Sequence, residues 1–193
     1  MDLLFWLPVI CCGALAGAST GLLGAYIVGM RIPFLGICVS HAALAGAVFG
    51  GLFGLAGPWL LLPALAGAVI AALLLGMLDP ESTRVDSNVL MGILFSLTLG
   101  LAFLGLGVYD IRGISKNDIL NLLWGNLNFC RWSDFYLMVT AAVLEIIVIA
   151  AFYKELRAIL FSRVHAAAAG VPVSLVWTAF LILTSVVLTV NFQ

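Results

Sequence analysis

Long apolar stretches separated by short polar ones dominate the chain. Residues 3–30 carry no acidic or basic side chain, and residues 32–78 carry none apart from His41. A helix rises about 1.5 Å per residue, so about 20 apolar residues cross the ~30 Å hydrocarbon layer of a membrane. The second stretch is too long for one crossing. We expect it to fold back at residues 50–58, where several glycines and a proline suited to the first turn of a helix coincide.

The whole pattern predicts an all-α integral membrane protein with a single helical-bundle domain over residues 1–193. Polar loops at residues 79–86 and 110–118 divide the apolar stretches. The segment 119–130 is apolar but too short to cross, and it contains a glycine and three asparagines, so we interpret it as a re-entrant or half-helical element. Six spans are predicted, near residues 3–30, 34–52, 58–78, 88–108, 134–153 and 172–191.

Composition excludes several classes of protein. The 193 residues are 64% hydrophobic and 9% charged, with a mean hydropathy of +1.24, which excludes a water-soluble domain and a disordered chain. Eight basic against nine acidic residues offer no basic surface for nucleic acid. A phosphate-binding GxxxxGK[ST] motif is absent from the sequence, so we expect no ATP hydrolysis and no enzymatic activity in this chain.

The four cysteines fit neither a disulfide framework nor a zinc-finger spacing. We expect Cys11, Cys12 and Cys130 to be small apolar packing residues.

Basic residues resist translocation, so their distribution predicts orientation. With the N-terminus outside, five of them face the cytoplasm and three face outward.

Small residues at every fourth position predict close helix packing on the first two spans. These stripes are Gly13, Gly17 and Gly21, and then Ala42, Gly46 and Gly50.

His41 lies about two turns into the second span, beside Ser40 and three residues after Cys38. An ionisable residue inside hydrocarbon is costly unless it has partners or faces a wet cavity. The neutral imidazole could offer a lone pair to a transition-metal ion that passes between the helices. The alternative, a histidine that merely bonds to a neighbouring helix, has equal weight from position alone.

Glu145 lies in the middle of the fifth span. It could be a second polar residue on a metal pathway, or a proton carrier. The interpretation we favour is structural, namely a protonated carboxyl that bonds to a polar residue on a facing helix.

Residues 154–172 form a polar and alanine-rich connection on the predicted cytoplasmic side. Ser162 can cap a short helix through the alanines, and Gly170 with Pro172 can end it before the sixth span. A compact helix at this position suits docking on a soluble partner. A plain connector is the alternative.

The order of these features resembles the permease subunits of bacterial and archaeal ABC importers for zinc, manganese or iron. Each motif is weak alone, but together they cover nearly the whole chain. The matching segments are Gly21–Val28 with Arg31, Gly36 with Ser40–Gly46, Arg84–Asp86 with Gly92–Phe95, Leu123–Leu127 with Trp132–Asp134, and Phe161–Ala166 with Gly170–Val173.

The resemblance implies a bundle similar to type II ABC importer permeases, in the inner (cytoplasmic) membrane. It implies a homodimer embedded in lipid, a cytoplasmic ABC ATPase and an extracytoplasmic metal-binding protein as partners, a transported divalent metal ion, and no permanently bound cofactor. His41 and Cys38 are the candidate metal ligands. The residues implied to couple to the ATPase are Phe161, Ser162, His165, Ala166, Gly170 and Val171.

The sequence departs from the family pattern at three points. Where the family usually has an aspartate four residues before the histidine, this chain has Ile37, which leaves softer ligands such as Cys38. Ser162 and Arg163 replace the acidic residues that often begin the coupling helix. The chain also ends about two helices early. Permeases for siderophores, haem or cobalamin, and a truncated protein that does not transport, are therefore the alternative interpretations.

Overall fold

The computed structural model describes residues 3–78, 86–115, 119 and 130–191. Within these residues, six helices are long and apolar enough to cross a membrane, which confirms the predicted spans. The segment predicted to be re-entrant, near 119–130, lies outside the described residues except for its two ends. The spans are α1 (Leu3–Gly29), α2 (Leu35–Leu52), α3 (Leu61–Met77) with its preceding 3₁₀ turn η1 (Gly57–Leu60), α5 (Ser87–Arg112), α7 (Trp132–Ala151) and α10 (Val173–Asn191).

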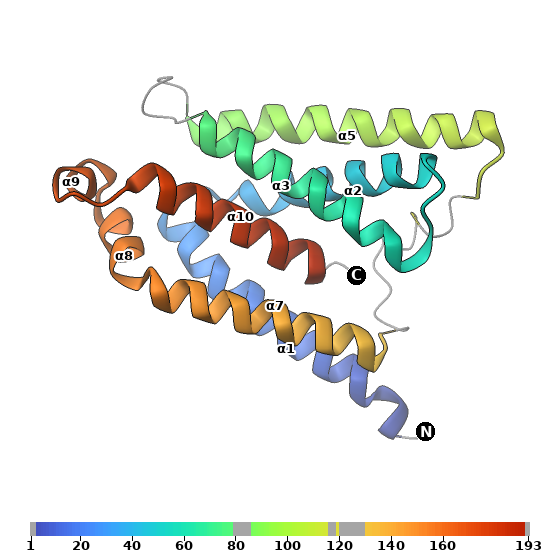
Figure 1. Cartoon of the computed structure of the whole chain (residues 1–193), viewed down its shortest axis with the longest axis horizontal. Coiled ribbons are helices and arrows are strands. Elements are labelled where there is room, and N and C mark those ends of the chain that lie inside the picture. The colour runs from blue at the N-terminus through green and yellow to red at the C-terminus, as the bar shows by residue number, and fades with distance from the viewer. Residues whose placement is uncertain (1–2, 79–85, 116–118, 120–129, 192–193) are drawn as a thin grey trace.

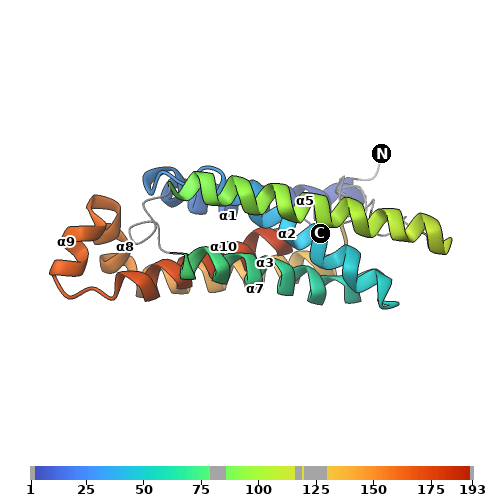
Figure 2. The same cartoon turned by 90° about the horizontal axis from the view of Figure 1, so that it is seen from above.

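The spans form two layers of three roughly aligned helices. Helices α1, α2 and α5 lie on one side, and α7, α10 and α3 lie on the other (Figures 1 and 2). α10 is the central helix, because it contacts α1, α2, α3 and α7. Two short helices, α8 (Tyr153–Phe161) and α9 (Arg163–Ala168), project from one end of the bundle (Figure 1).

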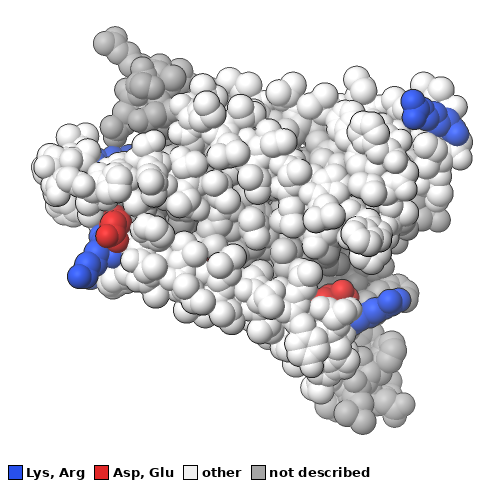
Figure 3. Space-filling model, in the orientation of Figure 1, with Lys and Arg blue, Asp and Glu red and all other residues white. Residues whose placement is uncertain are grey.

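On the face drawn in Figure 3, the described acidic and basic side chains lie towards the left and right ends of the bundle, and the described surface between them is uncharged. A band of this kind is what hydrocarbon requires, since a charged side chain at its centre costs a few kcal/mol or more.

Glycine allows α2 and α3 to pack closely. A methyl group added at Gly46 would overlap the backbone carbonyl of Pro63 and lie 3.2 Å from the Cα atom of Gly67. The small-residue stripe predicted on the second span therefore does pack backbone against backbone. The stripe on α1 differs at two of its positions, because methyl groups added at Gly17 and Gly21 would meet nothing within 4 Å among the described residues.

The buried hydroxyl groups of α10 form hydrogen bonds within their own helix. The hydroxyls of Thr184, Ser185 and Thr189 each donate to the carbonyl four residues earlier, at 2.7–2.8 Å. Because these donors are satisfied inside their own helix, the central helix can be buried among apolar neighbours.

Candidate functional site

His41 points out of the second turn of α2 towards α5. Its ring is half-buried and packs edge-on against the ring of Phe95, with 4.9 Å between the centroids. Its Nδ1 atom is buried and has no hydrogen-bond partner among the residues that the structure describes. A buried polar atom without a partner is uncommon in proteins and requires an explanation. The ring is therefore neither sealed among aliphatic groups nor fully occupied by bonds to the protein.

Ile37 and Cys38, which lie four and three positions before His41, have different surroundings. Ile37, one turn before His41, has half of its surface exposed (50%). Cys38 is fully buried in the main core cluster, which also contains Leu35 and Val39. Across the described part of the chain, no group of three or more His, Cys, Asp or Glu side chains could hold a metal ion. Any ion at His41 would therefore keep water or take ligands from elsewhere.

Glu145 lies where α1, α7 and α10 meet. Its side chain is only 1% exposed. The hydroxyl of Ser19 on α1 donates to its Oε2 atom, and the amide of Asn191 on α10 donates to the Ser19 oxygen at 3.4 Å. This is the bond to a facing helix that we favoured from the sequence. The second carboxyl oxygen, Oε1, is buried and has no hydrogen-bond partner in the described part of the chain.

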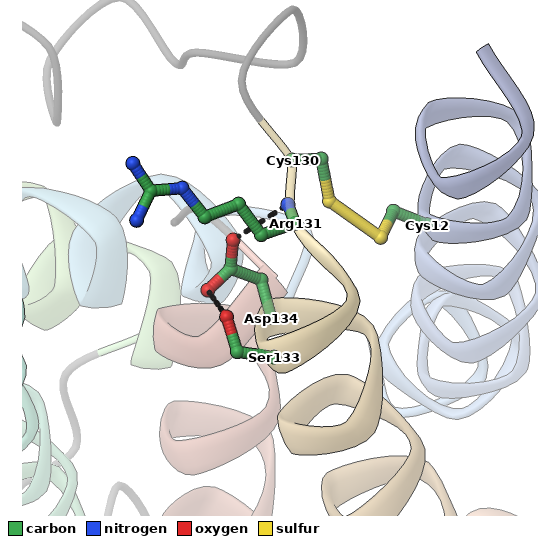
Figure 4. Close-up of a disulfide and its surroundings, with 5 residues drawn as sticks. All are labelled: Cys12, Cys130, Arg131, Ser133 and Asp134. Carbon is green, nitrogen blue, oxygen red and sulfur yellow. Dashed lines mark hydrogen bonds between the residues drawn. A yellow bond between two sulfur atoms is a disulfide. The ribbon is translucent and has the colours of Figure 1, made fainter. Parts of the chain in front are cut away.

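A disulfide joins Cys12 of α1 to Cys130, immediately before α7 (Figure 4). The expectation that both cysteines are packing residues is therefore wrong. A separation of 118 residues hides the pairing, because sequence patterns do not show that α1 and the start of α7 lie together. At the same end of α7, the backbone N–H of Arg131 donates to Asp134 at 2.9 Å and begins the helix.

The short helix predicted near 161–170 is present as α9, and its caps are those read from the sequence. Ser162 accepts a hydrogen bond from the backbone N–H of His165. At the other end Gly170 has φ +84°, and the N–H groups of Gly170 and Val171 donate to the carbonyls of Ala167 and Ala166. This is a Schellman motif, which needs a left-handed residue at the position of Gly170.

The end of α8 and the start of α9 form an exposed apolar tip. Phe161 is 85% exposed and Val164 is 66% exposed, while Ala166 is buried against the bundle core. The guanidinium of Arg163 lies 3.7 Å from the centroid of the Trp177 ring. Trp177 belongs to α10 and is itself buried in the core. The stack of Arg163 on Trp177 is thus one of the contacts that connect the tip to the central helix.

Comparison with known proteins agrees with this architecture. The family model of the ABC 3 transport family matches residues 2–193. The chain is 31% identical over 158 residues to the "Manganese transport system membrane protein MntC" of Listeria innocua, which covers 81% of this chain and 53% of the relative. It is 28% identical over 182 residues to the "Manganese transport system membrane protein MntD" of Bacillus subtilis, covering 87% and 60%.

A solved structure supports the fold. "PsaBC from Streptococcus pneumoniae in complex with Fab" aligns with a TM-score of 0.76 at 22% identity, over 98% of this chain and 65% of the solved chain. The chain spans 53% and 60% of the length of the two curated relatives. Because the family model covers the chain almost from end to end, this multi-pass membrane protein belongs to the ABC 3 transport family.

Proposed function

We propose that the chain is the membrane-spanning part of a permease that imports a divalent metal ion, with Mn²⁺ as the first cargo to test. A separate cytoplasmic ATPase supplies the energy, an extracytoplasmic protein delivers the ion, and two copies of the permease form the pathway. The printed names of the relatives MntC and MntD support manganese. The observation that carries the proposal is the unpartnered ring nitrogen of His41 inside an otherwise apolar span.

Two independent features support an orientation with the N-terminus outside. Disulfides persist in oxidising compartments and are rare in the cytosol, which favours the outer side for the end that carries Cys12 and Cys130. The helices α8 and α9 lie at the opposite end of the bundle (Figure 1). The excess of basic residues on that opposite side supports the same orientation. The exposed tip then faces the cytoplasm, where an ATPase would dock.

A single imidazole suits a site on a pathway better than a storage site. A channel or carrier site must attract the ion enough to admit it and bind it weakly enough to release it. His41 supplies one nitrogen donor, and Ile37 supplies none, so an ion beside α2 keeps most of its water or takes ligands from a second copy. The half-exposed Ile37 lies on the same face of α2, one turn away, on the side that another protomer could cover.

The exposed tip is the surface through which an ATPase would move the helices. An ATPase that contacts Phe161 and Val164 would move α9, whose first residue, Arg163, stacks on Trp177. Trp177 lies in the second turn of the central helix, so its displacement reaches the four spans that α10 contacts. Transport then follows because the ATPase shifts the balance between two packings of the same bundle.

Uptake of radioactive manganese by cells that carry the complete transporter tests this function. We expect His41→Ala to reduce uptake by at least tenfold with an unchanged amount of protein in the membrane. Thr140→Ala is the matched control, because Thr140 is an exposed polar residue of a span whose hydroxyl already bonds to the carbonyl of Leu137 at 2.7 Å. Normal uptake by the His41 variant would reject the proposed role of the imidazole.

A further inference from the structure

Glu145 is the one acidic residue in the interior of a described span, and no described residue compensates its charge. Neither α1 nor α10, the two spans that pack against α7, contains an Asp, Glu, Lys, Arg or His residue. α7 itself contains no Lys, Arg or His residue, and the next basic residue along the chain, Lys154, lies on the separate helix α8. Among the described residues, the one bonding group that reaches the carboxyl is the neutral hydroxyl of Ser19.

An ionised carboxylate in this position would be expensive. A buried charge costs several kcal/mol unless an opposite charge or several donors satisfy it. Within the described residues, one donor reaches Oε2, and Oε1 is buried with no hydrogen-bond partner. A proton on Oε1 removes the charge and leaves Oε2 as a carbonyl oxygen that accepts the Ser19 hydrogen bond. A metal ion at Oε1 would also neutralise the charge, but the described residues contain no group of three or more His, Cys, Asp or Glu side chains that could hold a metal ion.

The same three side chains connect helices that are far apart in sequence. Ser19 and Glu145 are separated by 126 residues, and Ser19 and Asn191 by 172. About two helical turns before Ser19 on α1, the disulfide at Cys12 joins α1 to the start of α7 a second time. α1 and α7 are therefore bonded to each other at two positions, by the hydrogen bond and by the disulfide. Asn191 connects that pair of helices to the central helix α10.

We propose that Glu145 is a proton-binding site, permanently occupied by one proton, which acts as an uncharged clamp between α1, α7 and α10. The clamp makes α1 and α7 move as one body when the bundle changes its packing. Glu145 neither carries protons across the membrane nor binds the transported metal.

Infrared spectroscopy of the purified, complete permease at neutral pH tests the proton directly. We expect a carboxylic-acid C=O stretching band in the native protein, its loss in Glu145→Gln, and no change in it when Mn²⁺ is added. Asp134→Asn is the control, because Asp134 is a partly exposed carboxylate at a helix start and its removal should leave that band unchanged. Absence of the band in the native protein, or its disappearance on addition of Mn²⁺, would overturn the proposal.

A functional comparison of two variants tests the clamp. Gln is uncharged and can still accept from Ser19, so Glu145→Gln should retain uptake within about twofold of the native rate and unfold at nearly the native temperature. Glu145→Leu keeps the volume but removes the hydrogen bond, and we expect it to unfold at a lower temperature. If Glu145→Gln lost uptake while remaining folded, a titrating or metal-binding carboxyl would be required and the clamp would be wrong. This uptake measurement rests on the proposed transport function, whereas the infrared and unfolding measurements do not.

Discussion

The contact between α2 and α3 predicts a large difference between two glycine substitutions of the same kind. In Gly46→Ala the new methyl group would overlap the carbonyl of Pro63 and lie 3.2 Å from the Cα atom of Gly67. Both neighbours are backbone, so no side chain can rotate away and the helices must separate. Inserting one extra carbon into a packed interior typically costs 1–3 kcal/mol. We expect about 2 kcal/mol of destabilisation, after allowing for the better helix propensity of alanine.

Gly17→Ala is the matched control, because its methyl group would meet nothing within 4 Å. Alanine there should be neutral or should stabilise by up to about 1 kcal/mol. The two variants are compared by thermal unfolding of the purified protein in detergent, followed by circular dichroism. On the usual scale for domains of this size, Gly46→Ala should unfold on the order of 5–10 °C below Gly17→Ala. Equal unfolding temperatures would refute the close approach of α2 and α3.

Three further substitutions test other parts of the structure. Gly170→Leu places a bulky residue at φ +84°, which costs of order 1–3 kcal/mol. We expect this variant to hydrolyse ATP with little uptake of the metal ion. Gly170→Asn should largely retain the coupling of ATP hydrolysis to uptake. Cys12→Ser should migrate differently from the oxidised native protein on a non-reducing gel and identically after reduction; identical migration under both conditions would exclude the bond to Cys130. Trp177→Leu should lower the number of ions moved per ATP by up to about fivefold, since the stack with Arg163 is worth about 1 kcal/mol; an unchanged ratio would exclude that pair as the contact through which the ATPase moves the helices.

The spans could be predicted because each depends on local composition. A run of apolar residues has only one low-energy way to cross hydrocarbon, so the six spans follow from the sequence with end errors of a few residues. α5 differs most, since it continues to Arg112 instead of ending near residue 108. The signal for its true end is Gly113, which caps the helix at φ +64°; the polar residues Asp110 and Arg112 obscured that signal.

The pairings between distant segments could not be predicted. The disulfide from Cys12 to Cys130 and the bond from Ser19 to Glu145 both depend on α1 lying beside α7, and no periodicity reports which spans are neighbours. The glycine stripes show the same limit. Gly46 packs against α3, whereas a methyl group at Gly17 would meet no described residue within 4 Å, although the sequence contexts of the two glycines are alike.

The candidate site was predicted in part. His41 was found because an ionisable residue within an apolar span is rare, and the caps at Ser162 and Gly170 were found because short helices need them. Cys38 was chosen for its nearness to His41 in sequence. Three residues along a helix also turn the side chain by about 60°, and this turn places Cys38 in the core.

Manganese is paramagnetic, so its bond to an imidazole can be observed without any transport. Pulsed electron paramagnetic resonance of the assembled transporter, trapped with Mn²⁺ and labelled with ¹⁵N-histidine, reports nitrogen nuclei bound directly to the metal. If His41 binds the ion, we expect a coupling to a histidine nitrogen in the native protein that disappears in His41→Ala and persists in a variant of the other histidine, His165→Ala. A native spectrum without that coupling, or a coupling that survives the loss of His41, would contradict binding of the metal ion by His41.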